Sequence, residues 1–172
     1  MKYMLSFLLF FISNVYSQNI ITFNPITEID VNELYRESID GILFQPQELY
    51  LKTKIDNSGF EDSYSRLIVL TTIPVSVNEI SYTVELVEND SSCIDVFGHE
   101  IKPSENWVTL KLDNNSMVNN IPEIFSDFNS DNGRFKQSEH QLRLSFGSFS
   151  ELSNIPIEYC SGNIELIVGV DV

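Results

Sequence analysis

Residues 21–31 read Ile-Thr-Phe-Asn-Pro-Ile-Thr-Glu-Ile-Asp-Val, the most informative stretch of the chain. Apart from Ile26, the residues alternate between a largely apolar set and a polar set, as in a strand with one buried face. The largely apolar set is Ile21, Phe23, Pro25, Thr27, Ile29 and Val31. Because Pro25 has no N–H to donate to a ladder, the pattern favours an edge or inserted strand. Such a strand can complete the sheet of another molecule, as a donor strand.

The segment before this strand has the features of a secretory signal peptide, which we place at residues 1–17. Lys2 supplies a basic start, residues 5–12 form an apolar core, and residues 15–17 (Val-Tyr-Ser) resemble a cleavage site. The apolar core is too short to anchor the chain in a bilayer. We therefore expect an exported, soluble mature protein that begins at Gln18 or Asn19 and is free of further membrane-length apolar runs.

Composition and charge argue against several classes of protein, namely nucleic-acid binders, binders of anionic lipid and disordered chains. The chain has 10 basic and 25 acidic residues, and cleavage removes Lys2, so the mature balance is 9 minus 25, or −16. This charge argues against nucleic acid and anionic lipid as partners. The hydrophobic content of 42% excludes a disordered chain. We expect a donor segment over residues 18–34 and one domain over residues 35–172.

Short strands separated by turn residues recur along this domain, and the sequence predicts no long helix. Turn chemistry such as Asp56-Asn57-Ser58-Gly59 separates the alternating segments. The predicted fold class is an all-β, antiparallel β-sandwich. Residues 114–136 are predicted to form an excursion loop with a short helical turn at residues 122–125. The predicted strands cover residues 48–55, 64–73, 80–87, 107–112, 140–146 and 162–170.

Cys93 and Cys160 are the two cysteines. In an oxidising compartment their expected fate is one long-range disulfide, which would stabilise the fold by roughly 4 kcal/mol in the loop-entropy model. A metal site would need more ligands than these cysteines, His99 and His140 supply. The disulfide would tie a segment that follows one strand to the residue just before the closing strand.

No set of catalytic residues can be assembled from the sequence. The motifs Gly-x-Ser-x-Gly and His-Glu-x-x-His are both missing from it, so we expect no enzyme, no cofactor and no metal. Residues 127–133 place oxygen-bearing side chains at alternate positions, but the glycine comes one place late for a calcium loop and Ser138 stands where a glutamate is needed. Trp107 is expected to anchor the core, the alternative being a surface aromatic that contacts sugar.

Three regions resemble the major pilins of the colonisation-factor-antigen family, the class 5 or alpha-fimbriae. The first is the mature start, Asn19-Ile20-Ile21-Thr22-Phe23 through Asp30-Val31-Asn32-Glu33-Leu34. The second is Leu49-Tyr50-Leu51 followed by Gly59-Phe60-Glu61-Asp62-Ser63-Tyr64-Ser65-Arg66-Leu67. The third is Gln141-Leu142-Arg143-Leu144-Ser145 and Tyr159-Cys160-Ser161-Gly162-Asn163-Ile164-Glu165-Leu166-Ile167-Val168. The chain departs from the family by its two cysteines and its stronger acidity.

The resemblance implies an immunoglobulin-like sandwich that lacks its final strand. It further implies a fimbrial subunit that a periplasmic chaperone and an outer-membrane usher assemble with neighbouring pilin subunits at the cell surface, where a host receptor is a further possible partner. Residues 21–31 would be the plug. One wall of the acceptor groove would be formed by Ile164, Leu166, Val168 and Val170.

A second hypothesis needs no partner strand. Residues 21–31 would pair within their own chain, and the protein would be a self-contained secreted β-sandwich that binds a carbohydrate or protein ligand. Trp107 and the phenylalanine-rich loop would then form the contact surface.

Overall fold

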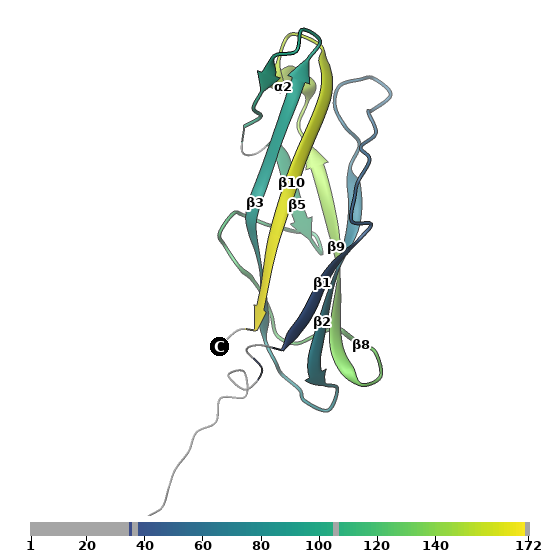
Figure 1. The fold of residues 1–172 in the computed structure, drawn as a ribbon, viewed down its shortest axis with the longest axis vertical. Helices are drawn as coiled ribbons and strands as arrows, with labels where there is room; N and C mark the ends of the chain where they lie inside the picture. Colours follow the sequence, from purple (N-terminus) through teal and green to yellow (C-terminus); the bar gives the residue numbers. More distant parts are fainter. Residues whose placement is uncertain (1–34, 36–37, 105–106, 171–172) are drawn as a thin grey trace, which may run out of the picture.

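The computed structural model describes Tyr35, residues 38–104 and residues 107–170. The predicted signal peptide and the predicted donor strand therefore lie outside the described residues. The described chain forms two antiparallel sheets that pack face to face (Figure 1). This arrangement is an immunoglobulin-like β-sandwich, which confirms the predicted fold class.

The larger sheet has the strand order β1-β2-β9-β5-β6, with β8 beside β9. Asp113 and Asn114 close the β5–β6 hairpin as a two-residue loop with φ values of 48° and 76°. Asp and Asn are among the few residues that tolerate this left-handed region, so the loop chemistry suits the turn. The strands are β1 (Ile39–Gln45), β2 (Ser63–Pro74), β5 (Val108–Leu112), β6 (Asn115–Ser116), β8 (Ser130–Asp131) and β9 (Phe135–Phe146).

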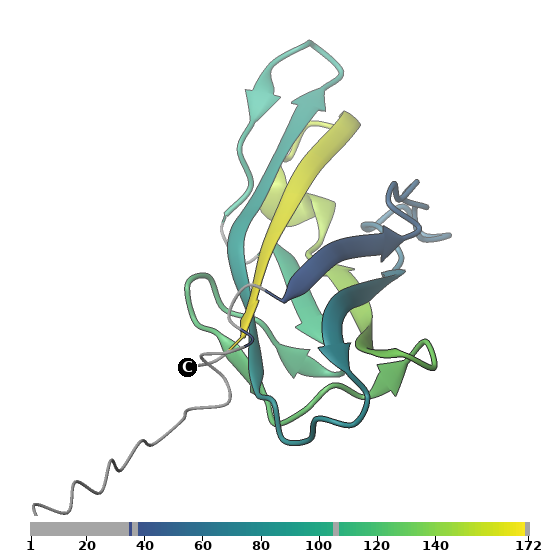
Figure 2. The same cartoon turned by 60° about the horizontal axis from the view of Figure 1, so that its bottom comes forward.

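The smaller sheet has the order β10-β3-β4, with β7 beside β3. Its strands are β3 (Tyr82–Asp95), β4 (Glu100–Ile101), β7 (Glu123–Phe125) and β10 (Ile157–Val170). Figure 2 shows β1 and β10 on the same side of the sandwich, one from each sheet. Ser148 caps the single helical turn α2 (Phe149–Leu152) by accepting a hydrogen bond from the backbone N–H of Ser150. Within the described ranges no helix is long and apolar enough to cross a membrane.

The core lies between the sheets and follows from strict alternation along the strands. In β2, Leu67, Val69 and Ile73 have no exposed surface and Thr71 on the same face is buried, whereas the residues at the alternate positions are more exposed. This period of two is what a strand requires when one face is buried. The other sheet contributes the fully buried Tyr82 and Val84 from β3.

Several predicted boundaries are wrong. Residues 48–55 do not form a strand; Thr53 makes one isolated bridge to Phe60. The edge strand of the larger sheet is instead β1 (Ile39–Gln45), which the sequence reading missed. Strand β3 continues through the polar residues 89–91 to Asp95, because β10 pairs with it along this whole length. Long-range pairing here outweighs the local turn preference of Asn-Asp-Ser.

The excursion loop is also more ordered than predicted. Residues 123–125 form strand β7 beside β3, not a helical turn. Strand β9 begins at Phe135, five positions before the predicted start, and β10 begins at Ile157, again five positions early. Cys93 and Cys160 therefore lie inside β3 and β10, not beside strands as expected.

Candidate strand-binding groove

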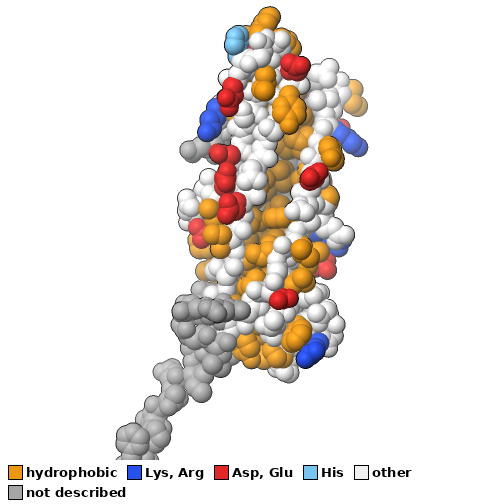
Figure 3. Space-filling model, in the orientation of Figure 1, with side chains coloured by type: hydrophobic (Ala, Val, Ile, Leu, Met, Phe, Trp, Pro, Cys, Tyr) orange, Lys and Arg blue, Asp and Glu red, His pale blue; other side chains and the backbone are white. Residues whose placement is uncertain are grey.

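Two strand edges lie open on the same side of the sandwich. Among the described residues, β1 pairs only with β2, and β10 pairs only with β3. Strand β1 ends the larger sheet and β10 ends the smaller one, so each presents an unpaired row of backbone groups. Figure 3 shows an apolar furrow between them that runs along the long axis of the molecule. We call this furrow the groove.

Side-chain exposure shows that the groove opens onto the core. Ile42 of β1 lies opposite Val69 of β2, so the two residues share the inner face of the sheet. Val69 is completely buried, yet Ile42 is 37% exposed. Phe44, opposite the buried Leu67, is also partly exposed. A residue on the inner face keeps solvent contact only where the neighbouring strand is missing.

The other side of the groove is β10. Its inner face carries Ile164, Leu166, Val168 and Val170, and Ile164 is the most exposed of these four. The last three keep 8–9% exposure, whereas Val84, the β3 partner of Val168, has none. These are the four residues that the resemblance assigned to the groove wall, and the structure places them along one edge of the opening.

The groove is long enough to receive an extended segment. Strand β10 has 14 residues, which corresponds to about 45 Å of extended chain. The alternating segment 21–31 would span roughly 35 Å in the same conformation. Strand β1 has 7 residues, so an inserted strand could find backbone partners on both sides along β1 and on β10 alone beyond it, while the apolar walls would take alternate side chains.

The expected bridge between Cys93 and Cys160 is present and lies beside the groove. The two cysteines are directly opposite each other in the β3–β10 ladder, with their Cα atoms 4.0 Å apart. Cys93 is buried and Cys160 is partly exposed on the groove strand. The bridge thus fastens the unpaired edge strand β10 to its single neighbour.

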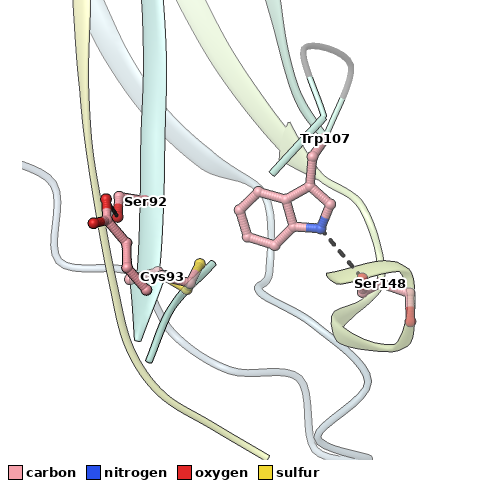
Figure 4. Close-up of a disulfide and its surroundings, with 6 residues drawn as sticks. Ser92, Cys93, Trp107 and Ser148 are labelled. Atoms are coloured by element: carbon pink, nitrogen blue, oxygen red, sulfur yellow. Dashed lines mark hydrogen bonds between the residues drawn. A yellow bond between two sulfur atoms is a disulfide. The ribbon is translucent and has the colours of Figure 1, made fainter. Parts of the chain in front are cut away.

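Trp107 lies on the same side of the sandwich interior as this disulfide, with its indole N–H directed at Ser148 (Figure 4), and it belongs to an aromatic cluster. Trp107 is 3% exposed, and its indole N–H donates to the backbone oxygen of Ser148 at 3.2 Å. Phe60 packs edge-on against Trp107 and Phe149. A Cβ on Gly147 would lie 2.6 Å from the Trp107 ring, so the close approach requires glycine here. Trp107 is a core anchor, as predicted.

Three buried polar groups, Tyr82, Ser138 and His140, form a chain between the sheets that ends at the exposed Asp113. Tyr82 of β3 donates its hydroxyl to Ser138 at 2.7 Å and lies 2.5 Å from Nε2 of His140. Nδ1 of His140 contacts Asp113 at 2.5 Å. Burial raises the pKa of Tyr82 to about 12, so the hydroxyl stays protonated at neutral pH. Asp113, the partner of His140, lies 27 positions away in the sequence, so no local pattern predicts this contact.

The oxygen-rich residues 127–133 do not converge on one point. Both carboxylate oxygens of Asp127 accept hydrogen bonds from Lys136, at 2.6 and 2.8 Å. Asp131 and Asn132 accept hydrogen bonds from backbone N–H groups of their own turn. In the part of the chain that the structure describes, no group of three His, Cys, Asp or Glu residues could hold a metal ion.

No protein-family model matches the sequence, and no curated protein matches it either. Among solved structures, the chain is similar to the CooA pilin subunit from enterotoxigenic Escherichia coli, with a TM-score of 0.51 and 15% sequence identity. The match covers 77% of this chain and 87% of the pilin. At this identity the likeness establishes the fold alone, which is the fold of a pilin subunit.

Proposed function

We propose that this chain is a structural, non-enzymatic pilin, in which residues 18–34 of one copy fill the groove of another. The observation that carries the proposal is the pair of unpaired edges, β1 and β10, on either side of exposed inner-face residues such as Ile42. An apolar opening of this length is unfavourable in water and presents a template for a further strand. The alternating segment ahead of the domain matches it in length and pattern.

The register of the inserted strand follows from the alternation. Only one parity of side chains can enter the groove, and the odd-numbered set contains Phe23, its largest member. A slip by one residue would bring Glu28 and Asp30 into an apolar site. Because an unpaired carboxylate is costly to bury, this slip is strongly disfavoured. The odd-numbered residues 21–31 are therefore the plugs.

Burial of the plugs makes the joint between copies durable. Ile21, Phe23, Ile29 and Val31 each contribute roughly 1.5–3 kcal/mol when fully buried. Backbone hydrogen bonds to β1 and β10 add to this. Pro25 fits because it keeps the strand extended and its missing N–H costs little at one position of a long ladder.

The same groove accounts for the assembly partners of the proposal. A subunit with an open core needs cover before a neighbour arrives, and a periplasmic chaperone supplies it. At an outer-membrane usher, the donor strand of the neighbouring copy replaces the chaperone. The fibre then extends from the cell surface and contributes to adhesion to host surfaces. The chain is made with a signal peptide and exported through the periplasm.

The competing hypothesis, a self-contained binding module, loses Trp107 and part of the phenylalanine-rich loop as contact surface. Trp107 is buried against Ser148 and the neighbouring phenylalanines, and Phe128 of the phenylalanine-rich loop is buried as well. Neither ring is available to stack on a sugar. The experiment below also tests whether residues 21–31 pair within their own chain.

Paired charge substitutions test the proposal on both partners of the joint. Phe23→Asp and Ile42→Asp each place a carboxylate in the groove, and we expect both to abolish fibres. The matched controls are Thr22→Asp, on the opposite face of the donor segment, and Leu43→Asp, on the exposed outer face of β1. Fibre content at the surface of cells that co-produce chaperone and usher is the readout, by electron microscopy and immunoblotting.

The outcomes separate the two functions. Sensitive plug positions with tolerant controls support the pilin. If Phe23→Asp assembles normally while Thr22→Asp does not, the face of the donor segment is wrong. If the unaltered protein forms no fibres and is secreted as a monomer, the self-contained module is correct.

A further inference from the structure

The two ends of the sandwich differ in their surfaces. Strand β10 begins at Ile157, opposite Asp95 in the β3–β4 hairpin, and ends at Val170, opposite Tyr82 at the start of β3. We call the end with the β3–β4 hairpin the tip and the end with the β2–β3 loop the base; they are at the top and bottom of Figure 1. Strand β1 starts near the base, since Ile39 pairs with Thr71 close to the end of β2.

The tip carries an exposed apolar patch. Its members are Ile94, Val96, Phe97 and Tyr159, and we call them the tip patch; Phe97 is 72% exposed and Tyr159 is 60% exposed. Tyr159 lies opposite Ile94 in the β3–β10 ladder, so both side chains stand on one face. Figure 3 shows apolar side chains at this end of the molecule. A cluster of this kind on a soluble domain indicates an interaction surface.

The tip hairpin is held firmly. The buried carboxylate of Asp95 accepts hydrogen bonds from the backbone N–H groups of Phe97 and His99, at 2.8 and 2.9 Å, and its second oxygen lies 3.1 Å from Nδ1 of His99. Gly98 takes a φ of 83° at the turn. Phe97 thus lies on a loop that these hydrogen bonds already hold in place. The loop therefore loses little conformational entropy when a partner binds.

The direction of the proposed donor strand determines what meets the tip. A strand that pairs antiparallel with β10, as every other neighbour in this sheet does, enters the groove at the base and leaves it at the tip. The predicted donor ends at Val31, and Ser38 at the start of the domain bonds to the backbone oxygen of Tyr35. The four Cα-to-Cα steps from Val31 to Tyr35 span at most about 14 Å. The base of the incoming copy must therefore lie against the tip of the copy whose groove it fills.

We propose that, in the fibre, the base of the neighbouring copy packs against the tip patch. This inference rests on the proposed function. It adds a second contact between the domains of neighbouring copies, separate from the groove. The base offers Val75, 42% exposed in the β2–β3 loop, and its N–H donates to the backbone oxygen of Arg134 at 3.1 Å. Exposed Glu100 and Glu158 flank the tip patch, opposite in charge to the exposed Arg134 of the base.

The contact is heterologous, because tip and base are different surfaces, and it repeats from copy to copy along the fibre. The inserted strand holds the copies together, whereas the tip patch limits the rotation of one domain relative to the next. Its loss should leave assembly intact and make the fibre more flexible.

Site-specific photo-cross-linking in assembled fibres tests the contact. Benzoylphenylalanine in place of Phe97 should give a cross-linked dimer whose partner peptide is residues 74–77 or contains Arg134. The matched control places the same group at Thr109, exposed on the outer face of β5, and should not capture the base. Capture of a different surface from Phe97, or only monomers from intact fibres, would overturn the tip proposal and leave the pilin function standing.

A functional readout accompanies the cross-link. Phe97→Ser should keep the subunit's melting temperature and fibre yield while the persistence length of the fibre in electron micrographs falls about twofold or more, as expected when a central aromatic anchor is removed. Unchanged stiffness would contradict the proposal. Failure of the unaltered protein to form fibres at all would instead overturn the proposed function first.

Discussion

Several carboxylates in this acidic chain are held in place by single, identifiable partners. Backbone N–H groups of His99 and Phe97 lower the pKa of Asp95 despite its burial. A hydrogen bond from the Arg143 guanidinium lowers the pKa of Asp62, which lies across the sheet from it. In both cases the folded chain binds a proton less readily than the unfolded chain does.

This sets the sign of the pH dependence. A lowered pKa contributes stability above the unfolded value, about 3.9 for Asp, and that contribution is lost as pH falls through the folded value. We therefore predict that denaturant midpoints decline as pH falls below about 4. Asp95→Asn removes the charge at one site, so the stability gap between it and the unaltered protein should narrow over this range. A gap that stays constant from pH 5 to pH 2 would show that Asp95 is not responsible.

At the level of elements, β10 is the least supported long strand. It is 14 residues long and pairs on one side only within the described chain. The disulfide from Cys160 to Cys93 fixes its register at one point of the ladder. A strand that walls the groove must keep its position while the groove is empty, and this bridge is the strongest constraint on it.

Removing the bridge should therefore loosen β10 first. We predict that Cys93→Ala/Cys160→Ala lowers the free energy of unfolding by about 2–5 kcal/mol and reduces subunit yield in the periplasm. In hydrogen exchange, amides of β10 should lose protection while those of β2, paired on both sides, keep theirs. The double variant avoids an unpaired thiol. A uniform loss of protection across both sheets would contradict a local role for the bridge.

At the scale of the whole molecule, the proposed donor strand and the groove on one chain would favour association. We predict that the mature protein, purified without a chaperone, forms oligomers that grow with concentration, because filling the groove in trans is a mass-action process. Light scattering over a hundredfold concentration range is the measurement. A synthetic peptide of residues 18–34 should suppress the growth, and the same peptide with Phe23→Asp should not. A monomer that is stable at all concentrations would indicate pairing of residues 21–31 within one chain.

Local patterns predicted much of this architecture. Residues 64–73 were predicted to form a strand, which the structure places at Ser63–Pro74, and two cysteines in a chain with a predicted export signal predicted their disulfide. Both inferences depend only on neighbours in sequence or on simple counting. Strand β1 was missed because its sequence, Ile-Asp-Gly-Ile-Leu-Phe-Gln, does not alternate: Ile42, Leu43 and Phe44 are three apolar residues in a row.

The sequence by itself determined the all-β class and the approximate place of several strands, because side-chain polarity and turn residues encode them at short range, and the count of two cysteines determined the disulfide pair. Only the tertiary structure decided that β3 and β10 run on through polar residues, that His140 meets Asp113, and that, within the described residues, β1 and β10 each leave one edge unpaired on the same side of the sandwich. These features depend on which distant segments pack together, and the free energy of that packing overrides the local preferences of turn residues. The groove lies between β1 and β10, and 112 positions separate the end of β1 at Gln45 from the start of β10 at Ile157. No local sequence pattern can therefore predict that these two strands lie on the same side of the molecule.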